Sequence, residues 1–131
     1  PLLLTSCGDK KELTVLAAAG LKEPFSQAVE SYEKKHPEVE VKVVYAGSGS
    51  LLVKLKNRLG DLYIPAAESY IKTAVGEGLV DPQTVRVLAY HRAVLVSKKP
   101  IEDIYSFYNV CSRIGISDPK EAAIGRVTYE L

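Results

Sequence analysis

The chain has 131 residues, of which 47% are hydrophobic and 25% are charged. These values are typical of an ordinary globular protein, and the length predicts one domain with a sizeable core. The 17 basic and 16 acidic side chains nearly balance, so we expect no basic stripe and no nucleic-acid partner. No apolar stretch reaches the length of about 20 residues that a membrane-spanning helix needs.

The first residues combine an apolar run, a cysteine and a charged segment. The sequence holds no methionine, so we expect it to begin downstream of an initiator. Apolar Pro1–Leu4 leads to Cys7, and polar residues follow. This order resembles a bacterial signal peptide that closes on a lipobox. We therefore predict that residues 1–12 are a lipobox and tether, with a lipidated Cys7 that holds the protein on a membrane surface. The alternatives are a free Cys7 thiol or a disulfide with Cys111.

A strand–helix–strand unit follows the tether. Leu13–Ala17 has the pattern of a buried strand, and Ala18–Leu21 turns out of it. Pro24 suits the first turn of a helix, which we expect to end before His36 because Pro37 follows. A second strand is predicted over Val39–Ala46. The two strands should be parallel, with a right-handed crossover between them.

The second predicted strand leads through four small residues, Gly47–Ser50, into a helix. The apolar residues of that helix fall on one face; they are Leu51, Leu52, Leu55 and Leu59. A helix start leaves backbone N–H groups unpaired, and together with the dipole and two hydroxyl groups it suits an anion. The alternative interpretation is that Ser48 or Ser50 only caps the helix.

The remaining chain divides near residue 84. Asp61–Pro65 predicts a third strand and Ile71 marks a third helix, which completes a first α/β lobe over residues 13–84. We expect residues 85–131 to form a crossover and part of a second lobe. In this part the pattern predicts extended segments over 85–90 and 93–96, a strand over 114–117, a turn at Asp118-Pro119 and a helix that begins within 120–125.

Small residues recur just after the predicted strands. They occupy Ala18–Gly20, Gly47–Ser50, Pro65–Ala67 and Ala123–Gly125. Ligands of open α/β sheets bind beyond the carboxyl ends of the strands, and small residues let backbone amides approach a ligand closely. The sequence therefore predicts a site at which backbone amides from several segments converge.

Four motifs in register carry a resemblance to a known family. They are Leu13–Leu21, Gly47–Leu51, Gly60–Pro65 and Ser117–Gly125. Together they resemble the molybdate- and tungstate-binding proteins that feed ABC uptake transporters. The resemblance implies an α/β fold of the periplasmic-binding-protein-like type II, with a parallel or mixed sheet flanked by helices and a second lobe that is incomplete in this chain. It also implies an extracytoplasmic location, an ABC permease as partner, and no cofactor besides the bound molybdate or tungstate.

The resemblance also implies which residues hold the ligand. Ser48 matches the position that donates a hydroxyl and an amide, and Gly49 and Ser50 continue that turn. Gly20 stands where relatives have serine, so only its backbone N–H could serve. Two further positions, Ala67 and Ile124, complete the set: Ala67 stands where many relatives have aspartate, and Ile124 matches a position whose amide contacts the anion. We expect no side chain to ligate a metal.

Neutral donors suit a receptor that must release its ligand, because they avoid the desolvation cost of a buried ion pair. A deprotonated dianion satisfies such donors, whereas a protonated phosphate presents an O–H without a partner. Sulfate or a phosphonate remains an alternative ligand, and a cytoplasmic sensor domain of the same fold is an alternative that the lipobox argues against.

A serine hydrolase is the rival class, and we expect the protein not to be an enzyme. Ser48 or Ser50 would need a histidine base. His36 lies at a predicted helix end, and His91 lies between extended segments, where a structural role is the simpler interpretation. Asp61 and Asp118 could form a carboxylate pair, but each sits at a predicted turn, where aspartate often caps.

Overall fold

The computed structural model describes residues 10–90, 100, 102–103, 105–106, 109, 115–120 and 122–129. Several predicted features lie outside these residues: the lipobox with Cys7, His91, the extended segment 93–96, and Cys111. None of the helices in the described part of the chain is both long and apolar enough to cross a membrane.

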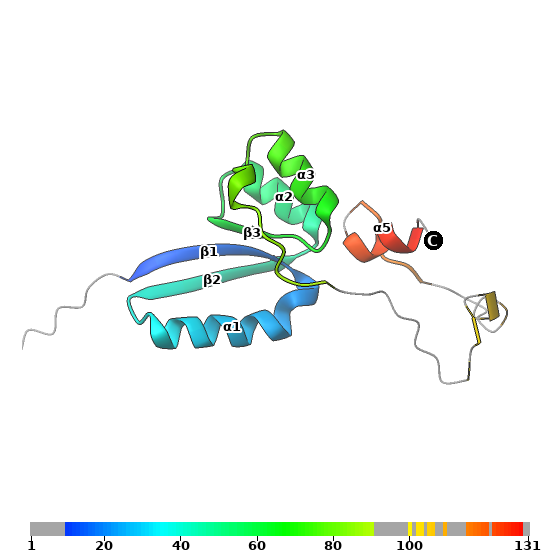
Figure 1. Ribbon diagram of the computed structural model, residues 1–131, viewed down its shortest axis with the longest axis horizontal. Coiled ribbons are helices and arrows are strands. Elements are labelled where there is room, and N and C mark those ends of the chain that lie inside the picture. The colour runs from blue at the N-terminus through cyan, green and yellow to red at the C-terminus, as the bar shows by residue number, and fades with distance from the viewer. Residues whose placement is uncertain are drawn as a thin grey trace, which may run out of the picture.

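Three parallel strands form the sheet, in the order β2-β1-β3 (Figure 1). They are β1 (Lys11–Ala18), β2 (Val39–Ala46) and β3 (Leu62–Ile64). The register places Val15 of β1 beside Val43 on one side and Leu62 on the other. The central strand is therefore the one that comes first in the chain, and the predicted parallel pairing of the first two strands is confirmed.

Helices cover both faces of the sheet, as Figure 1 shows. The short 3-10 helix η1 (Ala19–Leu21) leads into α1 (Lys22–Lys35), which lies on one face. On the opposite face lie α2 (Ser48–Lys56) and α3 (Glu68–Gly76). The predicted α/β class, with a parallel sheet flanked by helices, is confirmed. The later elements are η2 (Pro82–Thr84) and α5 (Ala123–Tyr129), and α5 lies beyond the ends of the strands.

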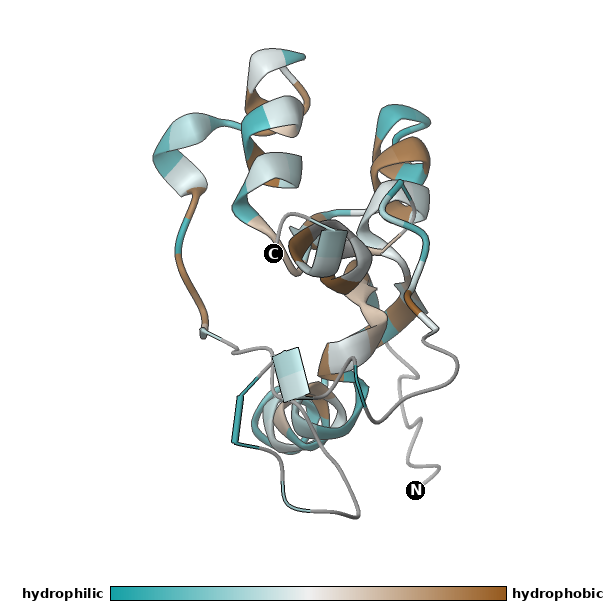
Figure 2. Ribbon diagram, turned by 90° about the vertical axis from the view of Figure 1, so that its right-hand side faces the viewer, coloured by the Kyte–Doolittle hydropathy of each residue, from teal (hydrophilic) through white to brown (hydrophobic). Residues whose placement is uncertain are grey.

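The core divides into two clusters, because successive residues of β1 point to opposite faces of the sheet. Leu16 packs with buried residues of α2, β3 and α3; these are Leu51, Leu55, Tyr63, Tyr70 and Ala74. Val15 and Ala17 pack with Ile64 on the α1 side, where the partners from α1 are only partly buried. Figure 2, which views the carboxyl ends of the strands, shows α1 almost end-on with mainly hydrophilic colours.

The structure differs from the predicted elements at three places. The predicted helical residue Leu59 lies outside α2, which ends at Lys56, and its side chain is 56% exposed. The cause is Arg58, whose positive φ of 56° turns the chain out of the helix. Residues 85–90, predicted as an extended segment, belong to no sheet among the described residues and are mostly exposed. Gly115–Ser117 also have no regular structure, although a strand was expected there; instead α5 packs its Gly125 directly against the Ser117 backbone.

Candidate anion site

The site predicted from the sequence lies at the carboxyl end of the sheet, where β1, β2 and β3 all end. The chain leaves β1 toward α1 on one face and leaves β2 toward α2 on the other (Figure 1). In open α/β sheets, ligands bind beyond the carboxyl ends of neighbouring strands whose connections part in this way, as those of β1 and β2 do. The fold therefore positions the N-terminus of α2 at the end of the sheet where ligands of such folds bind.

The helix α2 begins one residue earlier than a Ser48 cap, and three residues earlier than a Ser50 cap, would place its start. Gly47 is its N-cap, with φ −63° and ψ 146°, and no side chain caps the helix. The capping role that the sequence left open for Ser48 or Ser50 is therefore wrong, since both residues lie within the first turn. The first turn of a helix directs its amides outward without intrahelical acceptors, and the dipole adds a partial positive charge.

Ser48 is hydrogen-bonded to the segment that follows β3. Among the described residues, Ser48 has a buried polar side chain, and it is only 2% exposed. Its Oγ accepts a hydrogen bond of 3.0 Å from the Ala66 backbone N–H, and its carbonyl accepts one of 3.0 Å from the Tyr63 hydroxyl. These two bonds join the start of α2 to the turn between β3 and α3.

Ala67 lies in the same turn, one residue after the amide that contacts Ser48. It is the N-cap of α3 with an extended backbone, φ −139° and ψ 143°, and no side chain caps this helix either. Two uncapped helix starts, those of α2 and α3, are thus joined by a hydrogen bond. The sequence grouped the turns 47–50 and 65–67 correctly as neighbours.

Gly20 and Ile124 lie outside this set of hydrogen-bonded residues. Gly20 is in η1, exposed on the way to α1, and a Cβ added there would meet nothing within 4 Å. Ile124 is in α5, with its side chain 48% exposed. The preceding turn is fastened to α3, because the Tyr70 hydroxyl donates to the Lys120 carbonyl at 3.3 Å. No hydrogen bond of the described residues joins Gly20 or Ile124 to Ser48.

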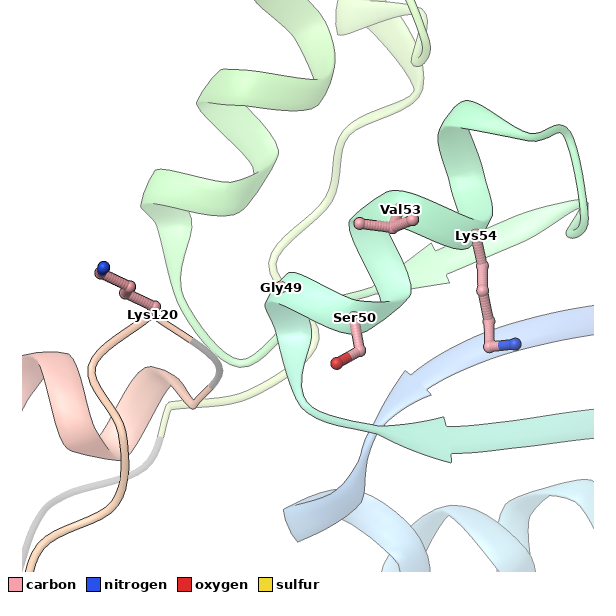
Figure 3. Close-up of a pocket in the computed structure, with 5 residues that line it drawn as sticks. All are labelled: Gly49, Ser50, Val53, Lys54 and Lys120. Atoms are coloured by element: carbon pink, nitrogen blue, oxygen red, sulfur yellow. The ribbon is translucent and has the colours of Figure 1, made fainter.

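An open pocket of about 490 Å³ adjoins the start of α2 (Figure 3). It is lined by Gly49, Ser50, Val53, Lys54 and Lys120. In Figure 3 the Ser50 hydroxyl points into the space beside the helix end, whereas the two lysine side chains extend away from it in different directions. The sequence motifs point only to neutral donors and indicate neither lysine. Lys54 could have been found, because it lies one helical turn after Ser50.

The histidine that the structure describes is far from the serines. His36 follows α1 and precedes β2, whereas Ser48 follows β2, so the full length of an eight-residue strand separates them. His36 contacts its own neighbours instead, with its Nδ1 3.5 Å from a Glu38 carboxylate oxygen and its ring 4.4 Å from that of Tyr32. His36 therefore cannot act as a base for Ser48.

The two aspartates considered as a carboxylate pair have separate hydrogen-bond partners. Asp61 accepts a hydrogen bond of 2.8 Å from the Thr14 amide, and Asp118 accepts one of 2.7 Å from the Lys120 amide. The bond of Asp118 is a local one, as expected at a turn, whereas Asp61 bonds to a β1 residue 47 positions away. Within the described part of the chain, no group of three or more acidic, histidine or cysteine side chains could hold a metal ion.

Comparison with known proteins supplies relatives of this chain. A protein of Haemophilus influenzae, provisionally named as a binding protein, is 30% identical over 130 residues, which cover 95% of this chain and 52% of that protein. YvgL of Bacillus subtilis, provisionally named as an ABC transporter substrate-binding lipoprotein, is 28% identical over 125 residues, with coverage of 92% and 48%. The chain thus spans about half the length of these curated relatives.

A solved structure and a family match agree with these relatives. The substrate binding domain of a provisionally named molybdenum ABC transporter from Clostridium difficile superposes with a TM-score of 0.50 at 35% identity, over 52% of this chain and 30% of that chain. This likeness confirms the predicted periplasmic-binding-protein-like α/β fold. Residues 13–131 match the family described as bacterial extracellular solute-binding protein. The chain therefore belongs to the bacterial extracellular solute-binding protein family.

Proposed function

We propose that the protein is an extracytoplasmic receptor that captures a tetrahedral oxyanion, molybdate or tungstate, and delivers it to an ABC importer. The family and the two curated relatives support a binding protein and not an enzyme. The name of the Clostridium difficile neighbour supports molybdenum as the element that the ligand contains.

One observation carries the proposal: α2 begins without a side-chain cap, at the carboxyl end of the sheet, with Ser48 buried in its first turn. Amides at such an end are donors that already point outward, so an anion can bind them without rearrangement. Hydrogen bonds to an ion contribute about 1.5–3 kcal/mol each. Five to seven such bonds, less the cost of ordering, reach micromolar affinity, which corresponds to about 8 kcal/mol.

The pocket lysines fit a receptor for an anion without becoming its ligands. Lys54 and Lys120 line the pocket beside the helix start and extend away from Ser50 (Figure 3). Positive charge around a binding crevice attracts an anion and raises its local concentration. Release stays possible, because the direct donors are neutral amides and hydroxyls and no buried ion pair has to be broken.

The location and partners belong to the same proposal. The family is described as extracellular, and YvgL carries the name of a lipoprotein. We propose that Cys7 is the lipid attachment site and that the ABC permease receives the ligand. Mass spectrometry of the protein purified from native membranes tests the anchor: a diacylglyceryl adduct on Cys7 is expected, and an unmodified Cys7 thiol would rule it out.

Calorimetric titration of the full-length protein tests the ligand. Molybdate and tungstate are expected to bind tightly, while sulfate and phosphate give no heat. Ser48→Ala should weaken molybdate binding about tenfold or more, since one hydrogen bond to an ion is lost. Thr73→Ala is the matched control, because Thr73 is an exposed hydroxyl of α3 that bonds only within its own helix, to the Ser69 carbonyl. Tight binding of sulfate would mean that sulfate, and not molybdate or tungstate, is the ligand. Heat only with a sugar or amino acid would refute the proposal.

A further inference from the structure

We infer that Tyr63 is a positioning residue of the proposed anion site, which holds Ser48 so that the Ser48 hydroxyl presents its hydrogen to the ligand. This inference rests on the proposed function and adds a residue that does not touch the ligand. A site arranged in this way selects an oxyanion in which the oxygen that accepts the Ser48 hydrogen carries no proton.

The hydroxyl of Tyr63 contacts the first turn of α2 from the sheet. Tyr63 lies on β3, its side chain is 9% exposed, and its ring packs in the core cluster with Leu16 and Leu51. The hydroxyl donates to the Ser48 carbonyl at 3.0 Å. Burial raises the pKa of Tyr63, with a smaller contribution from Tyr70, so the phenol keeps the proton that it donates.

This bond does more than satisfy a buried carbonyl. Ser48 is the first residue of α2, so its carbonyl already accepts the amide of the residue four positions later in the regular helical pattern. The carbonyl would therefore be satisfied without Tyr63, and a phenylalanine could fill the core equally well. What the hydroxyl adds is a fixed distance between the start of α2 and the rigid sheet.

A second bond fixes the side chain of the same residue. The Ser48 Oγ accepts the Ala66 amide at 3.0 Å, from the turn that follows the strand of Tyr63. A hydroxyl has one hydrogen and two lone pairs, and this bond takes one of the lone pairs. No hydrogen bond of the described residues takes the hydrogen itself. Held at both its carbonyl and its Oγ, Ser48 is thus oriented as a donor, and a ligand that presents its own O–H is disfavoured.

The variant Tyr63→Phe tests the inference in the full-length protein. It removes one hydroxyl and keeps the buried ring. We expect molybdate affinity to fall about tenfold, and the backbone N–H of Ala66 to exchange with solvent faster in NMR, because its acceptor is less fixed. The matched control is Tyr45→Phe. The Tyr45 hydroxyl lies 3.2 Å from the Ser26 Oγ, on the α1 side of the sheet, so neither quantity should change.

The outcomes separate the inference from the proposed function. Unchanged affinity and unchanged Ala66 exchange in Tyr63→Phe, with molybdate bound normally by the unmodified protein, overturn the inference and leave the function intact. Absence of oxyanion binding by the unmodified protein overturns both. Equal losses of affinity in Tyr63→Phe and Tyr45→Phe also overturn the inference, because a general loosening of the fold would then explain the effect. Only a selective loss with faster Ala66 exchange supports it.

Discussion

The two faces of β1 are packed very differently. On the α2 and α3 side, the two helices contribute five buried residues to the interior; these are Ser48, Leu51, Leu55, Tyr70 and Ala74. On the other side α1 is longer, with 14 residues, yet none of them is buried. The helix that starts at the candidate site is therefore fixed firmly to the sheet, whereas α1 covers its face more loosely. The close packing that fixes the start of α2 is therefore concentrated on one face of the sheet.

Truncation of core side chains tests this comparison with the largest effect. Leu51→Ala should lower the free energy of unfolding by about 2–5 kcal/mol, because Leu51 is fully buried and its neighbours relax only partly into the cavity left behind. Phe25→Ala on α1 should lower it by less, since Phe25 is only partly buried. Urea denaturation followed by circular dichroism measures both. An equal or greater loss in Phe25→Ala would break the comparison.

Two glycines test the same difference in packing between the two faces, with an intermediate expected effect. A Cβ at Gly60 would lie 2.6 Å from the Leu16 Cγ, inside the firmly packed face. Gly60→Ala should therefore destabilise the protein by about 1–3 kcal/mol through overpacking. Gly20→Ala should be nearly neutral, because its Cβ would meet nothing within 4 Å. Thermal unfolding of the two variants gives the ranking, and the opposite order would contradict the packing described for Leu16.

The pH dependence of stability gives a smaller effect on the same face. Burial raises the pKa of Tyr63, so above the usual tyrosine pKa of about 10 the folded protein keeps a proton that the unfolded chain releases. This group leaves the unfolding free energy constant below about pH 10 and lowers it as pH rises further, by at most about 1.4 kcal/mol per pH unit. Tyr63→Phe should remove that part of the slope in urea titrations at alkaline pH. Identical slopes in both proteins would show that Tyr63 is not shielded from water.

The smallest effect is expected at the far end of the same face. Glu12 and Lys42 lie on the side of the sheet that Leu16 faces, by the alternation of strand residues, but beyond the cover of the helices. They form an exposed ion pair whose hydrogen bond raises the pKa of Lys42. Lys42→Ala should leave the thermal midpoint unchanged within error, because exposed pairs contribute little. A large shift would mean that firm packing extends along the whole strand.

Local sequence patterns were sufficient for β1, β2 and β3 and for the buried face of α2. The alternation in β1 and β2, and the apolar spacing of Leu51 and Leu55, directly express which side is buried. The start of α2 was placed wrongly because the Ser48 hydroxyl bonds to Ala66, 18 residues away, instead of capping its own helix. Residues 85–90 have the composition of a strand, but a strand also needs a neighbour to pair with, which composition does not reveal.

The candidate site was predicted only in part, because some of its residues carry a local sequence signal and others are brought in by contacts of the folded chain. The small residues around Ser48 mark a place where a backbone can approach a ligand, and that signal is local. Lys120 and Tyr63 gave no such signal. Each enters the site region through a contact made by the folded chain, Lys120 by the bond from Tyr70 to its carbonyl and Tyr63 by its bond to Ser48. The roles of Ala67 and Ile124 came from family resemblance and remain predictions.

The central position of β1 has a consequence for how this fold forms. β1 leaves the ribosome before its two neighbours, and its contact with the β3 side spans 47 residues, as in the bond from Thr14 to Asp61. Pairings between distant residues form slowly, because a long loop must close first. During synthesis both edges of β1 are unpaired until β2 emerges, and the β3 edge stays unpaired for longer. A nascent chain that stalls before β3 emerges therefore carries an apolar strand with an open edge, which can aggregate or bind a chaperone.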